Sequence, residues 1–257
     1  MGYKIVFFDV DGTITNHEDG TIPQSTIEVI KTLKSKGIKV VAATGRPLSM
    51  CNELHELGIE TFITANGGYV KHNQELIHSV PMDKNLVKDV MDFATLHNNG
   101  LSFYTEEFSM NGVTEDGILR ALKETLSLNE YPETNKLIHN QDIFLLCLFA
   151  NDEAVDKYIH EFPHLTFKRW HPYVLNVLKE DVSKSLAILK TLEFFGIDKM
   201  DAIAFGDGEN DIDMLELVGL GIAMGNANDT LKNVADFVTK KSSDDGIEYA
   251  LKKFMII

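Results

Sequence analysis

Short apolar runs alternate with helical segments at both ends of the chain, and this alternation restricts the fold more than any other feature. The runs lie within YKIVFFDVDGT, IKVVAATG, MDAIAF and GLGIAMG. Continuous apolar runs of this kind are typical of strands buried on both faces of a sheet. A helix is expected between the first two runs, with Pro23 as its start signal and Gly37 as its stop signal. Further helices are expected at Pro47–Leu57, Asp211–Leu217 and Thr230–Ala235. Strands that alternate with helices predict an α/β fold built on a parallel sheet.

The middle of the chain has a different pattern. Longer amphipathic helices are expected at Leu86–His97 and Ile118–Leu126, and the strands IFLLCLFA and YVLNVL look antiparallel. We therefore predict a core formed by residues 1–82 and 182–257, into which residues 83–181 are inserted as a second domain.

The composition argues against several classes of partner. With 24 basic and 39 acidic side chains, the formal net charge is −15, so a general attraction to nucleic acid or to anionic membranes is not expected. No stretch approaches the roughly 20 apolar residues of a membrane span, and the N-terminus lacks the order of a signal peptide. We expect a cytoplasmic protein in which Cys51 and Cys147 are reduced thiols rather than a disulfide or a zinc site.

Two acids, Asp9 and Asp11, follow the first predicted strand. In an open parallel sheet, ligands bind at the carboxyl ends of the strands. Two carboxylates at such an end could hold a hard cation, or one could attack phosphorus while the other exchanges a proton with the leaving group. Gly12 would let the backbone approach an anion. An acidic turn that caps the following segment uses the same residues, so DVDGT alone does not decide between these interpretations.

A third acid, Asp207, follows the strand AIAF within GDGENDIDML, so it can meet Asp9 and Asp11 across neighbouring strands. Carboxylates that converge without a cation repel one another and raise one another's pKa. Magnesium would resolve this conflict, because it takes a few carboxylates together with waters and phosphate oxygens. The alternative is a Gly/Asn turn that begins a helix, with Asp211 as its capping acid.

Two further positions suit phosphoryl oxygens. Thr44 ends the strand VVAA, and Gly45 follows it at the start of the next helix, where hydroxyl and amide groups can bind an anion. Lys184 opens the helix that leads into the C-terminal half and could neutralise oxygen charge during phosphoryl transfer. Taken singly, a threonine there is more commonly a helix cap, and a lysine is usually solvated.

The four motifs DVDGT, ATGR, VSK and GDGEND, in this order, resemble those of the haloacid dehalogenase superfamily of phosphatases. The stretches ITANGG, GIAMGNA, ADFVT and DDGI look like the Cof-type branch, in which a large cap is inserted between motifs two and three. This resemblance covers nearly the whole chain. It implies a Rossmann-like, doubly wound parallel sheet as the core and an α+β cap that carries substrate specificity.

The resemblance also implies roles for individual residues. Asp9 would be the nucleophile that forms an aspartyl-phosphate, and Asp11 the acid that protonates the leaving alcohol and then activates water. Thr44 and Lys184 would hold the phosphoryl group. The implied magnesium ligands are Asp9, the backbone carbonyl of Asp11, and Asp207, with Asp211 behind them. The residues expected to line the pocket or lie near the phosphate are Gly12, Gly45, Asn66 and Asn210.

The inserted domain offers one further candidate. Trp170, His171 and Tyr173 precede the return of the chain to the core and could reach a substrate. Trp170 and Tyr173 are more often packing residues, so we take His171 as the candidate for substrate binding.

These observations predict a magnesium-dependent phosphatase that hydrolyses a small phosphomonoester, such as a sugar phosphate or a nucleotide, through an aspartyl-phosphate. Roughly 140 residues separate Thr44 from Lys184, enough for a cap that excludes water. A phosphomutase of the same fold is one alternative. A regulatory phosphate-binding protein without turnover is another, although binding alone would not need both Asp9 and Asp11. The sequence leaves the substrate and the oligomeric state open.

Overall fold

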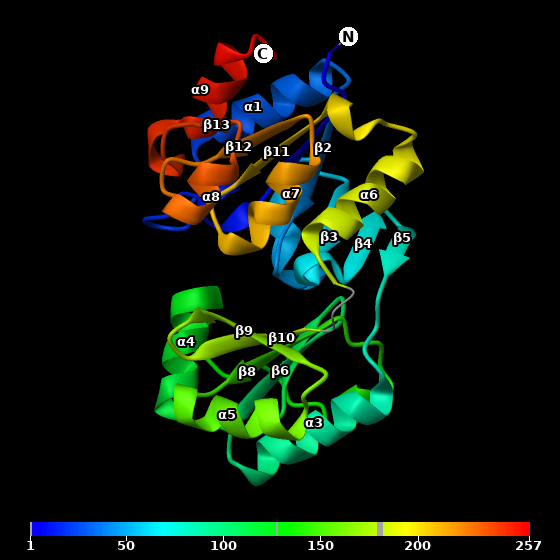
Figure 1. Cartoon of the computed structure of the whole chain (residues 1–257), viewed down its shortest axis with the longest axis vertical. Helices are drawn as coiled ribbons and strands as arrows, with labels where there is room; N and C mark the ends of the chain where they lie inside the picture. Colours follow the sequence, from blue (N-terminus) through cyan, green and yellow to red (C-terminus); the bar gives the residue numbers. More distant parts are fainter. Residues whose placement is uncertain (1, 127, 179–181) are drawn as a thin grey trace. The chain divides into compact units, whose positions relative to one another are not determined.

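The computed structural model describes residues 2–126, 128–178 and 182–257, and they form two compact units (Figure 1). The first unit comprises Cys51–Ser79, Ser183–Ile257 and the described residues up to Arg46. The second comprises Pro47–Met50 and the described residues from Val80 to Val182. Met82 lies in the apolar core of the second unit, which is why this division falls slightly before the expected boundary at residue 82.

A mixed sheet forms the centre of the first unit. Among the described residues its strand order is β13-β12-β11-β1-β2-β3-β4-β5. Every neighbouring pair from β13 to β3 is parallel, whereas β4 and β5 are added as an antiparallel hairpin at one edge. The strands are β1 (Ile5–Phe8), β2 (Lys39–Ala43), β3 (Thr61–Thr64), β4 (Tyr69–His72), β5 (Glu75–Ser79), β11 (Ala202–Gly206), β12 (Leu220–Ala223) and β13 (Phe237–Val238).

Helices cover both faces of this sheet, as the doubly wound prediction requires (Figure 1). Residues of α6, α7 and α8 share one apolar core with alternate residues of the parallel strands, including Phe7 and Val41. On the other face, α1 lies against β2 and also contacts α9. The helices of the first unit are α1 (Gln24–Ser35), α2 (Asn52–Glu56), α6 (Lys184–Phe195), α7 (Ile212–Leu217), α8 (Asp229–Val234) and α9 (Gly246–Lys253).

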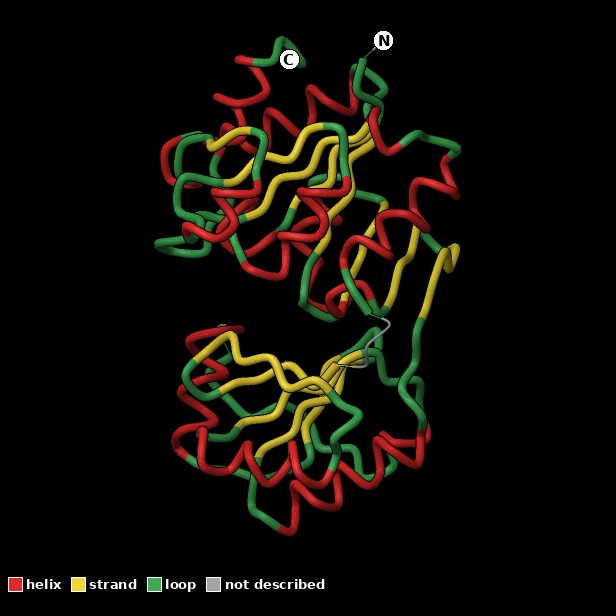
Figure 2. The backbone as a smooth tube through the Cα atoms, in the orientation of Figure 1, coloured by secondary structure: helices red, strands yellow, loops and turns green. Residues whose placement is uncertain are grey.

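The second unit is an antiparallel sheet, and the helices α3 and α5 lie along one of its faces (Figure 2). Its strand order is β7-β6-β8-β10-β9. The antiparallel pairing expected for IFLLCLFA and YVLNVL is confirmed by β8 and β10. Apolar residues of α3 and α5, such as Val90 and Tyr158, pack against the sheet. Its elements are α3 (Lys84–Leu96), β6 (Gly100–Tyr104), β7 (Phe108–Met110), α4 (Asp116–Leu126), β8 (Leu145–Phe149), α5 (Asp152–Glu161), β9 (Thr166–His171) and β10 (Val174–Leu178).

The helix expected at Pro47–Leu57 is not continuous. Leu48–Cys51 forms a 3₁₀ turn, and α2 begins only at Asn52. The backbone N–H of Ser49 donates to the carbonyl of Glu106 in the second unit. This bond takes the chain away from the helical path before α2 begins.

Cys51 and Cys147 are both buried and form no disulfide, and burial raises the pKa of each thiol to about 12. Among the described residues, none of the helices combines the length and the apolar character needed to cross a membrane.

Ser183 caps the N-terminus of α6, of which Lys184 is the first residue. Its hydroxyl accepts a hydrogen bond of 3.2 Å from the backbone N–H of Leu186. Replacing such a cap by alanine typically costs about 1 kcal/mol. We expect Ser183→Ala to lower the urea midpoint of unfolding by the equivalent of about 1 kcal/mol. The matched control is Ser35→Ala at the exposed end of α1, for which we expect a smaller change; equal midpoints for the two variants would contradict this cap.

Candidate active site

The register of the sheet brings three of the expected site residues to one edge. Phe8 on β1 lies opposite Ala42 on β2 and Phe205 on β11. Because these three strands are parallel, the residues that follow them emerge at the same carboxyl edge. Asp9, Thr44 and Asp207 are such residues, so topology alone makes them neighbours.

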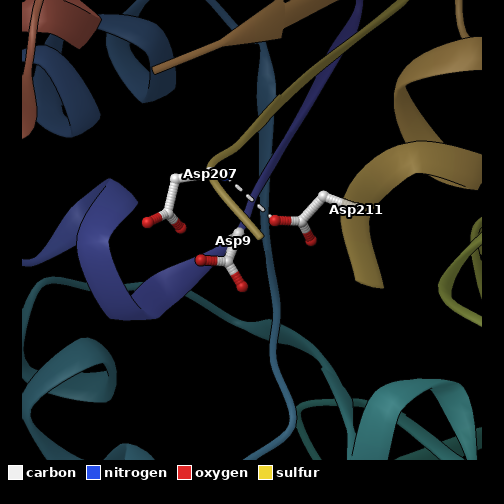
Figure 3. A group of neighbouring side chains, drawn as sticks. All are labelled: Asp9, Asp207 and Asp211. Carbon is white, nitrogen blue, oxygen red and sulfur yellow. Dashed lines mark hydrogen bonds between the residues drawn. The ribbon is translucent and has the colours of Figure 1, made fainter. Parts of the chain in front are cut away.

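Three carboxylates meet at this edge (Figure 3). Asp9, Asp207 and Asp211 each offer an oxygen, and these oxygens lie within 4.8 Å of one another. Asp9 is 6% exposed and Asp211 is 0% exposed. Buried carboxylate oxygens are the ligands that hard divalent cations take in proteins. The arrangement therefore fits a divalent cation.

Lys184 supplies the positive charge within this cluster. Its Nζ lies 2.7 Å from Oδ1 of Asp9 and 2.6 Å from Oδ1 of Asp211, and its side chain is 0% exposed. A buried ammonium without partners would be strongly unfavourable, so these two hydrogen-bonded ion pairs are what keep it charged. One ammonium faces three carboxylates, and the cluster keeps an excess of negative charge.

The pKa values follow from burial and from this excess. Burial, then the charge of Asp211, raises the pKa of Asp9 well above its ordinary value. Burial, then the charge of Asp211, raises the pKa of Asp207 to about 6. Burial alone would lower the pKa of Lys184, but the carboxylates of Asp211 and Asp9 outweigh it and hold that pKa above its ordinary value. The mutual rise expected for converging carboxylates is thus present at Asp9 and Asp207.

Asp211 is held on both of its carboxylate oxygens. Oδ1 accepts from Lys184, and Oδ2 accepts from the backbone N–H groups of Asp207 and Gly208, each at 3.0 Å. Figure 3 draws the bond from Asp207 as a dashed line. These bonds suit a residue that orients the turn after β11 and the ammonium of Lys184, in keeping with the position behind the ligands that the resemblance implied.

The side chain of Asp11 does not join the cluster, in contrast to the expected gathering of Asp9, Asp11 and Asp207. Oδ1 of Asp11 instead accepts from Nη2 of Arg46 at 2.5 Å, and the Asp11 side chain is 55% exposed. Arg46 also pairs with Glu53 at 3.0 Å. An opposite charge attracts the Asp11 carboxylate, whereas three nearby carboxylates would repel it, which accounts for the difference.

Gly12 packs directly against Asp207. Its φ is +84°, and a Cβ at this position would collide with the Asp207 carboxylate. The left-handed backbone and the missing side chain are both needed there. Gly12 thus sits beside the cluster, and its absent Cβ leaves the space that the carboxylate of Asp207 fills.

A second group of expected residues lies around Thr44. The hydroxyl of Thr44, which is fully buried, accepts from the backbone N–H of Arg46 at 3.0 Å. The backbone N–H of Asn66 donates to the carbonyl of Thr44, and the side chain of Asn66 accepts from Nδ2 of Asn210 at 3.0 Å. A Cβ on Gly45 would lie 3.2 Å from Oδ1 of Asn66. Thr44, Gly45, Asn66 and Asn210 therefore form one connected wall of the first unit.

His171 belongs to the second unit, at the end of β9. Its Nε2 lies 3.1 Å from a carboxylate oxygen of Glu124, and its Nδ1 accepts from the backbone N–H of Tyr173. Trp170 and Tyr173 are each close to half exposed. Substrate contact by His171 stays a prediction.

Sequence reasoning missed two residues beside the site. Arg46 has no predicted role beyond its place in the motif ATGR, although its side chain holds Asp11. Asn226 has no predicted role, although its amide donates to both Gly12 and Asp207. Asn226 follows β12, the next strand along the same edge, and that position was a signal that could have found it.

Comparisons with known proteins agree with this geometry. The haloacid dehalogenase-like hydrolase family matches residues 6–251. YkrA of Bacillus subtilis, whose assignment as a phosphatase is provisional, is 38% identical over 261 residues, covering 100% of both chains. YitU of the same organism, named as a 5-amino-6-(5-phospho-D-ribitylamino)uracil phosphatase, is 30% identical over 97% of each chain.

A solved structure extends the likeness to three dimensions. The sugar phosphatase BT4131, described as a subclass IIB member of the haloacid dehalogenase superfamily, superposes with a TM-score of 0.87 at 32% identity. The match covers 99% of this chain and 100% of that one. The family matches residues 6–251, and YkrA resembles this chain over the full length of both proteins. This chain therefore belongs to the haloacid dehalogenase-like hydrolases.

Proposed function

We propose that this protein is a magnesium-dependent phosphatase that hydrolyses a small phosphomonoester through an aspartyl-phosphate on Asp9. The observation that carries the proposal is the group of the buried Asp9 and Asp211 and the partly buried Asp207 beside the ammonium of Lys184. Membership of a hydrolase family and relatives named as phosphatases of phosphate esters support it. BT4131 is a sugar phosphatase, and the substrate named for YitU carries a phosphoribityl group, which favours a phosphorylated sugar or polyol derivative.

Asp9 is the proposed nucleophile. Its carboxylate would attack phosphorus, and the bond from phosphorus to the leaving oxygen would break. Lys184 holds Oδ1 of Asp9 at 2.7 Å, which fixes the direction of the carboxylate before substrate arrives. The same ammonium and the hydroxyl of Thr44 would bind phosphoryl oxygens, where positive charge and hydrogen-bond donors stabilise the transition state.

Asp11 is the proposed proton donor for the leaving alcohol and the base that then activates water. Its carboxylate is 55% exposed and outside the buried cluster, so it can exchange protons with solvent, whereas Asp9 cannot do so readily. Arg46 holds it in the structure. In this role the carboxylate of Asp11 would leave Arg46 and turn to the leaving oxygen.

The residues that would hold Mg²⁺ are Asp9, Asp207 and the backbone carbonyl of Asp11. When bound, the cation would neutralise phosphoryl oxygen charge and relieve the repulsion between carboxylates. The negative excess of the cluster and the raised pKa of Asp207 support this assignment. We further assign the second unit the role of a cap that sets specificity, with His171 as a candidate contact.

Replacing Asp9 tests the mechanism. Asp9→Asn removes the nucleophile while Lys184 keeps Asp211 as its partner, so the fold should survive. We expect hydrolysis of p-nitrophenyl phosphate in magnesium to fall by at least about a thousandfold, with an unchanged circular dichroism spectrum. The control is Asp229→Asn, an exposed acid in the first turn of α8, which should keep the wild-type rate. A folded Asp9→Asn protein with wild-type turnover would refute the mechanism.

Gly12 offers a test of the carboxylate geometry. Gly12→Ala places a methyl group where the carboxylate of Asp207 lies, so we expect a loss of phosphatase activity of about tenfold or more, as for other changes to the supports of metal ligands. Gly20→Ala is the matched control, because Gly20 also has a positive φ, +73°, but nothing lies within 4 Å of its Cβ position. Both variants carry backbone strain of about 1–2 kcal/mol, and only the first should lose activity. Equal activity in the two would show that Asp207 tolerates displacement.

The raised pKa of Asp207 predicts a pH dependence of stability in the metal-free protein. The folded pKa of about 6 exceeds the ordinary value of 3.8, so the folded state binds more protons than the unfolded state between these values. The contribution of Asp207 is therefore fully present below pH 3.8 and is lost as the pH rises through about 6. In a chelator, we expect the melting temperature of the wild type, relative to Asp207→Asn, to fall across this range. A difference that does not vary with pH would contradict the prediction.

A further inference from the structure

Asn226 lies in a turn after β12 that backbone hydrogen bonds hold in place. The backbone N–H of Met224 donates to Gly206, at the end of β11, and that of Gly225 donates to Lys240, each at 2.9 Å. A Cβ on Gly225 would lie 2.6 Å from the backbone nitrogen of Lys241, so only glycine lets the turn approach that segment so closely. The position of Asn226 is thus set by the backbone on both sides.

Both the amide nitrogen and the amide oxygen of Asn226 form hydrogen bonds with the loops around the site. Its Nδ2 donates to the carbonyl of Gly12 at 2.9 Å and to Oδ2 of Asp207 at 3.0 Å. Its Oδ1 accepts from the backbone N–H of Ser242 at 3.0 Å. The N–H of Ser242 can only donate, so Oδ1 must face it, and the two amide hydrogens must face Gly12 and Asp207. The orientation of the amide is therefore determined by its partners.

The partners of Asp207 differ from those of the other two carboxylates. Lys184 bonds to Asp9 and to Asp211, whereas Asp207 accepts from neutral donors, Asn226 at Oδ2 and the hydroxyl of Thr13 at Oδ1. A neutral donor orients a carboxylate but leaves its negative charge available to a cation. An oxygen with two lone pairs can accept from Asn226 and still face a metal ion.

We propose that Asn226 is a positioning residue for the cation site: it holds Asp207 in the orientation that binds the ion and ties that carboxylate to the loop of Gly12. The inference rests on the proposed function, because it assumes that Asp207 is a metal ligand. Asn226 would act on the ion only through its hydrogen bonds to Asp207 and Gly12. Residues that orient metal ligands in this way typically change metal affinity 10- to 100-fold when they are removed.

The test is a calorimetric titration of Mg²⁺ into metal-free wild-type protein, Asn226→Ala and Asn228→Ala. Asn228 is in the same segment, but its side chain caps α8 by accepting from Leu231, so Asn228→Ala should lose stability by about 1 kcal/mol and keep the wild-type affinity for Mg²⁺. We expect Asn226→Ala to raise the dissociation constant for Mg²⁺ by about 10- to 100-fold. Each protein is titrated well below its melting temperature, so that loss of fold is not mistaken for loss of affinity.

A second variant keeps the test decisive if Asn226→Ala does not fold. Asn226→Ser retains one donor in a shorter side chain, and it should bind Mg²⁺ more weakly than the wild type but fold. A folded Asn226 variant with wild-type affinity would overturn the inference while leaving the cation site intact. Wild-type protein that takes up no Mg²⁺ would overturn the cation site itself, and the inference with it.

Discussion

The buried ammonium of Lys184 is the interaction on which the rest of the site depends. It forms ion pairs with both Asp9 and Asp211 in a buried environment, and removing one partner of a buried ion pair typically costs about 3–5 kcal/mol. Its position is not set by the pairing alone. Ala187, Ile188 and Leu192, on the same helix, pack into the core against the sheet, so the packing of α6 determines where the ammonium lies.

This dependence links the stability of the first unit to its chemistry. Asp213 accepts from the backbone N–H of Ser185 at 3.1 Å, which ties the start of α6 to α7. Gly67, with a φ of +104°, approaches the carbonyl of Ser183 so closely that a Cβ would collide with it. The start of α6 is therefore held by contacts on two sides. A catalytic side chain such as that of Lys184 needs a fixed position of this kind, because small displacements reduce the reaction rate.

The fold and most of the candidate site could be predicted because both follow from local patterns. The apolar runs identify the strands, and the parallel topology carries Asp9, Thr44 and Asp207 to one edge. Side-chain partners could not be predicted in the same way. Whether Asp11 faces the cluster or Arg46 depends on charges from another loop, and the bond from Asn226 to Gly12 joins residues that are 214 positions apart. The break before α2 likewise depends on a bond to a distant segment.

The place of β1 in the sheet bears on how the chain folds during synthesis. β1 lies between β2 and β11, so one of its edges finds a partner early and the other waits until residues about 200 positions later have emerged. At about 5–20 residues per second, this delay is about 10–40 s. During that time the nascent chain presents an apolar strand with an unpaired edge, the kind of surface that chaperones protect from aggregation.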